Sequence, residues 1–282
     1  MPDMTPSAVL QVEGLVKRFS TGDETITALD HVSFEVAQGE VLSVIGPSGC
    51  GKSTVFNIIG GLTDADEGRV VVEGEAVSGP HPAIGMVFQE ESTFPWRTVA
   101  ENIAFPLEIA GKAKDERVAR ARQYLALVGL QGFDRHYPAE LSGGMRQRVA
   151  IARTLASQPK ILLMDEPFAA LDEQTRFLLG DKVMQIQQKL AQTTLLVTHN
   201  IAEAVQLSDR VVVMTYRPGR VKRVVAIDLP RPRTSEVVGS VAFQAFVAEI
   251  WNDLREEASR GMLDAEAHSR RVAIGTPASL NE

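Results

Sequence analysis

The chain has 282 residues, of which 44% are hydrophobic and 23% charged, a composition that excludes general disorder. Its 29 basic and 36 acidic residues give a net charge of −7, which argues against a protein whose main task is to wrap nucleic acid. This length fits one domain that carries an insertion or an appendage.

No segment of the chain is expected to cross a membrane. The longest uninterrupted apolar run is Tyr124–Val128, whereas a bilayer-spanning helix needs about 20 apolar residues. The N-terminal residues lack the basic and apolar regions of a secretory signal. The single cysteine, Cys50, cannot form an internal disulfide, and the five histidines show no metal-ligand spacing. We therefore expect a soluble protein of a reducing cytoplasm.

The first ninety residues favour strands with one helix among them. The predicted strands are at 9–19, 31–37, 41–45, 69–73 and 84–88, and the predicted helix is at 53–60. The run at 41–45, VLSVI, is typical of a buried strand and leads directly into a glycine-rich segment.

A mainly helical block interrupts this pattern between about 96 and 157. Apolar residues recur at spacings of three and four within 115–130, which is the pattern of an amphipathic helix, and 144–157 also favours a helix. Strands are then predicted at 160–164, 194–198 and 210–214, with a long helix at 173–190. Because strands alternate with helices, we expect a mostly parallel sheet covered on both faces.

The C-terminal part changes character after Pro230. The segment PRPR is a stiff turn or linker. Residues 241–255 then form the clearest amphipathic pattern in the chain, with Phe243, Phe246, Ile250 and Leu254 among the apolar positions of one face. The last twenty or so residues lack such a pattern, and we expect them to be disordered.

The strongest motif is the loop GPSGCGKST at 46–54, which matches G-x-x-x-x-G-K-[ST] between a predicted strand and a predicted helix. Glycines let backbone N–H groups approach phosphates, and the helix presents its positive end to the charge. Lys52 is expected to neutralise the β- and γ-phosphates and Ser53 to bind Mg²⁺. The alternative is a chance match in a glycine-rich turn. The residues expected to bind ATP are Gly46, Pro47, Ser48, Gly49, Cys50, Gly51, Lys52, Ser53 and Thr54.

Cys50 lies inside this loop, where a small residue at a variable position is the simpler interpretation. The alternative is a reactive site. A thiol at a helix N-terminus should be acidified, and its oxidation would block nucleotide binding.

The segment KILLMDEP places Asp165 and Glu166 at the end of an apolar strand. Ligands of open α/β sheets bind at that edge. Asp165 is expected to hold Mg²⁺, directly or through water, and Glu166 to activate the attacking water as a general base. An ordinary exposed acidic pair is the alternative, and the phosphate-binding loop weakens it.

A second anion-binding segment lies at LSGGMRQRVAIAR, where Ser142, Gly143 and Gly144 precede a predicted helix. The alternative is a simple serine N-cap followed by a flexible glycine pair. The segment LSGGMRQR resembles the signature motif of ABC-type ATPases, and the resemblance covers roughly residues 9–255.

In that family two ATPase domains dimerise head to tail, and each nucleotide lies between the phosphate loop of one domain and the signature of the other. The resemblance therefore implies that Ser142, Gly143, Gly144 and Asp172 contact nucleotide held by a second copy. Asp172 occupies the position of the D-loop aspartate in FAALD.

Three further residues resemble family positions in the correct order. Phe19 resembles the aromatic residue that stacks on adenine, with a core phenylalanine as the alternative. Gln89 in MVFQE resembles the glutamine that contacts Mg²⁺ and water. His199 in LLVTHN resembles the switch histidine that contacts the γ-phosphate. The implied catalytic residues are Glu166, His199 and Gln89, and the implied Mg²⁺ ligands are Ser53, Gln89 and Asp165.

The resemblance also implies an α/β fold of the P-loop NTPase, RecA-like kind, with a mostly parallel sheet. The core and an N-terminal antiparallel β subdomain would occupy 1–88 and 158–230, and an inserted helical subdomain 89–157. A helical extension would follow at 231–258, and the expected disordered tail at 259–282.

Segments outside the ATP site are similar to importers of the nitrate, sulfonate and taurine group, notably FQEESTFPWRTVAENIAFPLEI and MTYRPGRV followed by DLPRPR. The resemblance implies a homodimeric ATPase on the cytoplasmic side of the bacterial inner membrane. It would drive a separate permease and serve a solute-binding protein indirectly, with no nucleic acid partner. Phe94 and Trp96 are expected in the permease-facing groove, with the core of the helical block as the alternative.

The alternative is a soluble ABC ATPase that drives a non-transport machine. Only 90 residues separate Lys52 from Ser142, which leaves no room for the long coiled coil of ABC ATPases that act on chromosomes. The chain also has a single set of motifs, unlike the tandem ABC proteins that act on ribosomes. These features favour the importer interpretation. The solute contacts the permease and the binding protein, so this sequence does not identify it.

Overall fold

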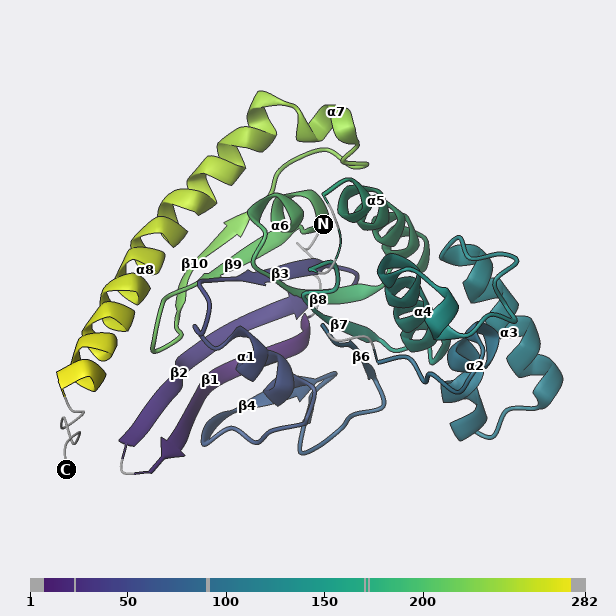
Figure 1. Cartoon of the computed structure of the whole chain (residues 1–282), viewed down its shortest axis with the longest axis horizontal. Coiled ribbons are helices and arrows are strands. Elements are labelled where there is room, and N and C mark those ends of the chain that lie inside the picture. The colour runs from purple at the N-terminus through teal and green to yellow at the C-terminus, as the bar shows by residue number, and fades with distance from the viewer. Residues whose placement is uncertain (1–7, 23, 90–91, 170, 172, 275–282) are drawn as a thin grey trace, which may run out of the picture.

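The computed structural model describes residues 8–22, 24–89, 92–169, 171 and 173–274. These residues form three layers (Figure 1). A central sheet lies between a set of helices on one face and a smaller sheet with one helix on the other.

The central sheet has six strands in the order β10-β9-β3-β8-β7-β6. Their bounds are Val41–Ile45 for β3, Ile84–Val87 for β6, Ile161–Asp165 for β7, Thr193–Thr198 for β8, Arg210–Met214 for β9 and Val221–Ala226 for β10. Strands β9, β3, β8, β7 and β6 pair in parallel, and the edge strand β10 is antiparallel to β9. The predicted mostly parallel sheet is therefore confirmed.

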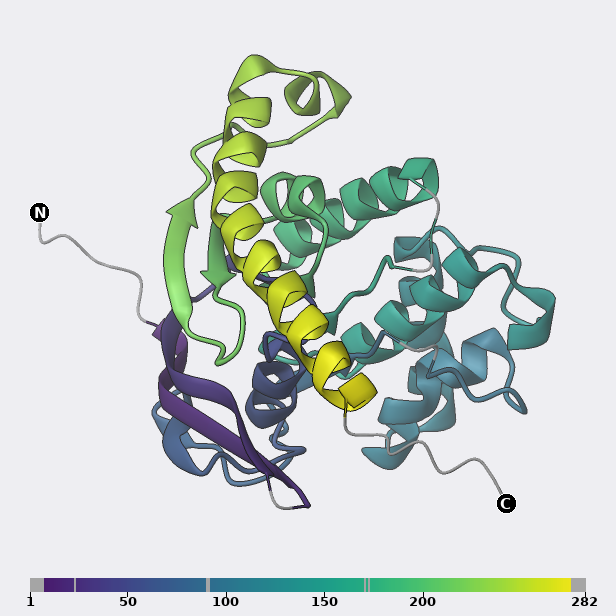
Figure 2. The same ribbon diagram turned by 60° about the vertical axis from the view of Figure 1, so that its left-hand side comes forward.

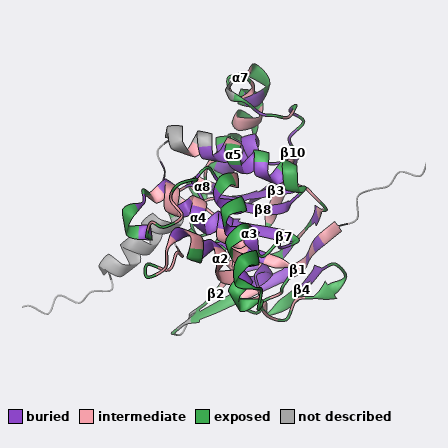
Figure 3. Cartoon of the chain, turned by 90° about the vertical axis from the view of Figure 1, so that its right-hand side faces the viewer, coloured by how far each residue is buried: buried purple, intermediate pink, exposed green. Residues whose placement is uncertain are grey.

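Alternation along the buried strands divides the core between the two faces of this sheet. In β3, Leu42 and Val44 pack with the smaller sheet, whereas Val41 and Ile45 face the opposite side. All five residues of β3 are buried, because a parallel strand covered on both faces has no side in water. Figure 3 shows buried residues concentrated in β3, β8 and β7.

The smaller sheet is antiparallel, with strand order β2-β1-β4-β5. Its strands are β1 at Ala8–Thr21, β2 at Glu24–Ala37, β4 at Glu67–Val72 and β5 at Glu75–Ala76. Helix α1, Lys52–Ile59, packs between this sheet and the central one through the buried Phe56. The strands β1 and β2 are longer than the sequence predicted, because together they form one long hairpin interrupted by register shifts.

The helical block consists of α2 at Val99–Ile109, α3 at Lys114–Leu127, a 3₁₀ turn at Pro138–Glu140 and α4 at Gly143–Ala156. Helix α2 begins at a capping box: Thr98 Oγ1 accepts from the Glu101 N–H, and the Glu101 carboxylate accepts from the Thr98 N–H. Buried Asn102 ties the start of α2 to the preceding loop through four hydrogen bonds. The outer face of α3 is exposed (Figure 3).

The remaining helices are α5 at Glu173–Leu190, α6 at Ile201–Leu207, α7 at Ser235–Val238 and α8 at Val241–Ile274. Helix α8 runs beside the β9–β10 hairpin in both views (Figures 1 and 2) and anchors there through Phe243, Ile250 and Leu254. We expected an irregular tail from residue 259, but α8 continues to Ile274. That region is rich in helix formers even though it lacks an apolar stripe.

Within the described ranges, none of the helices has the length and apolarity that crossing a membrane would require.

Candidate active site

The carboxyl ends of four parallel strands bring the sequence-predicted residues to one edge of the central sheet. Ile45 of β3 pairs with Thr198 of β8, and Asp165 of β7 pairs with Val197 of β8. The phosphate loop, the acidic pair and the histidine therefore follow three adjacent strands. Gln89 follows β6, which pairs with β7.

The loop at 46–54 connects β3 to α1 and needs glycine at two strained positions. Gly51 has φ 99°, and a Cβ there would lie 2.6 Å from Leu29 Cδ2. Gly49 has φ 75°, a conformation that L side chains rarely adopt. Lys52, 7% exposed, bends back over the loop, and its ammonium donates to the carbonyl oxygens of Gly46 (2.8 Å) and Pro47 (3.1 Å).

A cavity of about 480 Å³ opens beside this loop. Its walls come from β1, β2, the phosphate loop and the ends of the central strands. The lining residues are Phe19, Ile26, Ala28, Ser48, Gly49, Gly51, Lys52, Ser53, Thr54, Gln89, Glu166 and Arg217. The cavity thus gathers seven of the ten residues that the sequence assigned to nucleotide binding within one copy, and it adds three that the sequence did not assign.

The cavity is lined by both hydrophobic and polar residues. Phe19 is 43% exposed, and the Lys17 ammonium lies 5.6 Å from the centre of its ring. The alternative of a core phenylalanine is therefore wrong at this position. Gln89 is exposed and lines the same cavity.

Asp165 lies close enough to the Ser53 hydroxyl for that group to lower the pKa of its carboxyl. Burial raises the pKa of the Asp165 carboxyl, and the neighbouring Glu166 charge adds to that rise, whereas Ser53 and Lys52 oppose it. Its Oδ1 atom is buried and has no hydrogen-bond partner within the described residues. A carboxylate held in this way is suited to bind a cation.

The described residues contain no cluster of three or more His, Cys, Asp or Glu side chains able to hold a metal by themselves. Ser53 and Asp165 supply oxygen ligands of the kind that Mg²⁺ prefers, and this ion usually completes its shell with water and substrate phosphates. The donor set therefore fits Mg²⁺ bound together with a nucleotide.

Glu166 adopts a left-handed backbone conformation, φ 44°, at the point where β7 ends. Its N–H donates to the Val197 carbonyl (2.8 Å), which fixes this turn. A strained non-glycine residue at such a position is typical of functional sites. The carboxylate lines the cavity, and its Oε2 lies 3.0 Å from Nδ1 of His199.

His199 is exposed at the edge of the site and reaches it through Glu166 rather than lining the cavity itself. The next residue, Asn200, accepts a hydrogen bond from the Glu203 N–H and caps α6. Asparagine is among the preferred residues at a helix N-cap. The histidine is therefore held at a fixed turn between β8 and α6.

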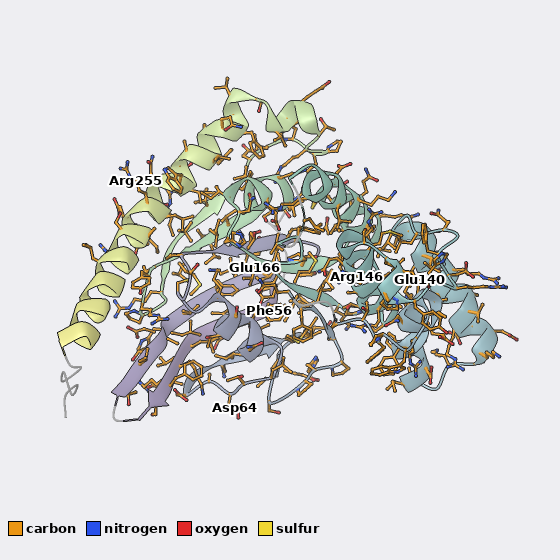
Figure 4. The ribbon with its side chains drawn as sticks, in the orientation of Figure 1. Phe56, Asp64, Glu140, Arg146, Glu166 and Arg255 are labelled. Atoms are coloured by element: carbon orange, nitrogen blue, oxygen red, sulfur yellow. The ribbon has the colours of Figure 1, made fainter. Side chains whose placement is uncertain are left out.

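The signature segment lies apart from the cavity of its own chain. Ser142 caps α4 by accepting from the Met145 N–H (3.3 Å), and Gly143 and Gly144 form the first turn. None of the three lines the cavity among the described residues. In Figure 4, Glu140 and Arg146, on either side of this segment, lie away from Glu166 toward the helical block. Asp172 lies outside the described residues.

Cys50 does not have the reactivity that its place at a helix N-terminus suggested. The side chain is fully buried, and this burial raises the pKa of the thiol despite the nearby Lys52. Desolvation of the thiolate outweighs the helix dipole here. The interpretation as a small residue fits the structure, and the acidified thiol is wrong.

Sequence reasoning missed Ile26, Ala28 and Arg217. Ile26 and Ala28 lie on β2, which wraps over the phosphate loop, and their pattern is that of any strand. Arg217 lies in the turn after β9, more than 160 residues from the loop that it contacts. The segment MTYRPGRV was visible as a motif, but only the fold brings it to the cavity.

Comparisons with known proteins agree with this geometry. A family model described as ABC transporter matches residues 29–169, which is half of the chain. An uncharacterized ABC transporter ATP-binding protein of Methanocaldococcus jannaschii is 49% identical over 253 residues, covering 90% of this chain and 94% of the relative.

Two further relatives carry transport names. An aliphatic sulfonates import ATP-binding protein of Bacillus cereus is 41% identical, over 90% of this chain and 97% of its own length. A bicarbonate transport ATP-binding protein of Synechococcus elongatus is 45% identical over 86% of this chain but only 38% of its own length.

Among solved structures, the dimeric ATP-binding cassette MJ0796, in a post-hydrolysis state bound to ADP and Pi, is similar with a TM-score of 0.70 and 33% identity. The similarity covers 78% of this chain and all of that one. Together, the family match, the relatives and the nucleotide-type cavity show that this chain belongs to the ATP-binding subunits of ABC transporters and is an ABC-type ATPase.

Proposed function

We propose that two copies of this chain bind ATP between the phosphate loop of one copy and the signature segment of the other. The observation that carries this proposal is the separation of two helix N-termini suited to anions, since the loop before α1 lines the cavity and Ser142 does not. A second copy is needed to bring them together. Asp172, Gly143 and Gly144 would act with Ser142 across that interface. The dimeric, ADP-bound cassette supports the arrangement.

In this proposal Glu166 accepts a proton from the attacking water. Its left-handed backbone, its place in the cavity wall and its contact with His199 support the assignment. His199 holds the carboxylate and donates toward the γ-phosphate. Gln89 orients the water from the end of β6. Catalysis then consists of positioning and charge neutralisation rather than covalent chemistry.

Phe19 would stack on the adenine base, and the loop residues 46–54 would surround the phosphates with backbone N–H groups. Ser53, Asp165 and Gln89 would hold Mg²⁺, which neutralises developing charge on the phosphates when bound. Lys52 would exchange its two carbonyl partners for phosphate oxygens. The unpaired Asp165 Oδ1 supports the metal assignment.

The first test is Glu166→Gln. This variant should bind ATP, form a stable dimer on gel filtration and hydrolyse ATP at a small fraction of the unaltered rate. The matched control adds Ser142→Arg to it, which should prevent the dimer while leaving ATP binding to the monomer intact. Unaltered turnover would contradict the general-base role, and a monomer at saturating ATP would contradict the shared site.

We further propose that this subunit powers import of a small solute of the nitrate, sulfonate or taurine type through a separate membrane permease. The sulfonate relative supports this solute class, and the bicarbonate relative extends it to another small anion. The subunit would lie at the cytoplasmic side of the inner membrane, and a binding protein would deliver the solute to the permease.

Exposed apolar side chains at the helical block support permease docking. Trp96, just before α2, is 71% exposed, and Ile109, at the end of α2, is 73% exposed. Trp96 stacks beside Phe94, whose ring also contacts Phe105. The core alternative for Trp96 is therefore wrong, whereas Phe94 is partly buried.

The second test measures assembly and uptake. Trp96→Ala should abolish co-purification with a multi-span permease while the isolated subunit keeps its ATPase activity. Uptake assays with nitrate, sulfonates, taurine and bicarbonate then identify the solute. Full cellular function without any membrane partner would favour the soluble, non-transport alternative instead.

A further inference from the structure

The turn between β9 and β10, residues 215–220, packs tightly against the phosphate loop. The Gly219 N–H donates to the Ala28 carbonyl (2.9 Å), and the Gly219 carbonyl accepts from the Asp30 N–H (3.0 Å). A Cβ on Gly219 would lie 2.1 Å from the Cys50 carbonyl oxygen. Backbone therefore meets backbone here, and the turn forms a fixed wall beside the loop.

Arg217 extends from this turn into the nucleotide cavity. Its Nε donates to the Gly49 carbonyl oxygen (3.0 Å), and a Cβ on Gly49 would meet its Nη2 at 2.8 Å. Across the described residues this is the one hydrogen bond its guanidinium makes, so the outer nitrogens keep their donors. Arg217 and Lys52 are the two cations in the described lining of the cavity.

Helix α8 fixes the position of this turn. Glu257, 2% exposed, accepts from the Tyr216 N–H (3.0 Å) and from the Lys222 ammonium (3.0 Å). Although burial opposes ionisation, these two donors outweigh it and hold the pKa of the Glu257 carboxyl below its usual range. The charged form is therefore the one that holds the turn.

One turn further along α8, the ring of Tyr216 lies against the backbone of Gly261. A Cβ on Gly261 would approach Cε2 of the ring to 2.9 Å. Helix and turn can approach this closely only because residue 261 has no side chain. The segment of α8 beyond Leu254 thus has a structural role at the turn that carries Arg217.

We infer that Arg217 binds the phosphate chain of the nucleotide, and that α8, through Glu257 and Gly261, is the positioning element that holds it there. The free donors of the guanidinium form a planar fork suited to phosphate oxygens. The phosphate loop, Phe19 and the β9–β10 turn then form three walls of one nucleotide site. The C-terminal helix thereby controls how tightly the subunit holds nucleotide.

The direct test measures ATP and ADP affinity of the isolated subunit by calorimetry. Arg217→Ala should weaken both by roughly 10-fold, in line with one charge-assisted contact, and the loss should shrink at high salt. Arg217→Gln keeps a donor for the Gly49 carbonyl but removes the charge, and it should match Arg217→Ala. Unaltered affinity in Arg217→Ala, or recovery in Arg217→Gln, would overturn the phosphate contact.

The role of α8 is tested by the split between KM and kcat. Gly261→Ala and Glu257→Leu should each raise the KM for ATP several-fold and leave kcat at saturating ATP unchanged. Neither should raise KM further in an Arg217→Ala background, because they act through that residue. Additive effects on KM would overturn the positioning role.

Arg255→Ala is the matched control, since it removes a cation from the outer side of α8, away from the turn (Figure 4). Its KM should equal that of the unaltered protein. Gly261→Ala is the milder of the two α8 variants, so it decides the question if Glu257→Leu fails to fold. An unaltered KM in Gly261→Ala, with the same fold, would refute control by α8.

Discussion

Replacing Glu203 with glutamine should make the stability of the fold less sensitive to pH. Glu203 lies in α6, 8% exposed, where its Oε2 accepts from the Thr198 hydroxyl (3.2 Å) and its Oε1 has no partner among the described residues. Burial raises the pKa of this carboxyl to about 7, and the Glu166 charge adds to it, whereas Thr198 and Arg176 oppose the rise.

The size of the effect follows from this pKa. Between the ordinary value of 4.5 and about 7, the folded state binds a proton that the unfolded state releases. The free energy of unfolding therefore falls as pH rises through that interval. At 1.36 kcal/mol per pH unit, the loss is roughly 3 kcal/mol in all, most of it between pH 5 and pH 8.

Glutamine cannot ionise, so Glu203→Gln should lack this loss. Its buried amide carries a cost that is the same at every pH. The stability difference between the variant and the unaltered protein should accordingly shift by roughly 2–3 kcal/mol in favour of the variant from pH 5 to pH 8. Urea unfolding of the nucleotide-free subunit at four pH values measures this shift.

The matched control is Glu116→Gln, which changes an exposed glutamate of α3. It should follow the unaltered protein at every pH. If the difference between Glu203→Gln and the unaltered protein is constant from pH 5 to pH 8, then Glu203 does not carry a buried ionisation and the reasoning fails.

Three further changes test other parts of the structure. Lys52→Ala should weaken ATP binding by roughly 10- to 100-fold, because a charge-assisted contact is lost; calorimetry that finds unaltered affinity would refute the phosphate-loop assignment. Asn102→Ala should lower the free energy of unfolding by roughly 3 kcal/mol, since the Phe94 N–H and three carbonyls each lose a hydrogen bond to this buried side chain; a change under about 0.5 kcal/mol in urea titrations would contradict it. Phe243→Ala should lower the free energy of unfolding by roughly 3–5 kcal/mol, since this ring is 1% exposed between α8 and the sheet. If the variant keeps its stability while α8 becomes open to proteolysis, packing of α8 does not stabilise the core and the reasoning fails.

The sequence identified elements whose pattern is complete within a few residues. The run VLSVI predicts β3 residue for residue, because a strand buried on both faces leaves an uninterrupted apolar signal. The apolar stripe at 241–255 likewise predicts the start of α8. Residues 221–226 gave no such signal, since VKRVVA is an edge strand with one side in water. Helix α6 has seven residues, too few to show a helical period.

The candidate site likewise contains some residues that a local sequence pattern identifies and others that it does not. Its phosphate loop and acidic strand end were predicted because the chemistry requires particular residue types next to particular strands, and its histidine was predicted from the resemblance to the family's switch histidine. The structure showed contacts between residues that are far apart in the sequence. Arg217 and Gly49 are 168 residues apart and share a hydrogen bond. Glu257 contacts the same turn from α8, and the sequence pattern of α8 predicts only an apolar face that packs on the core.

The sequence by itself therefore determined the family, the nucleotide chemistry and the order of those strands and helices that have a clear local pattern, because short motifs and local periodicity are properties of neighbouring residues. Only the tertiary structure decided which side chains are desolvated. In the folded chain the Cys50 thiol is buried, which raises its pKa, and burial raises the pKa of Glu203 to about 7. Folding also brings Arg217 into hydrogen-bond contact with the phosphate loop. Desolvation and long-range contact depend on what packs around a residue, and that is fixed when the chain folds.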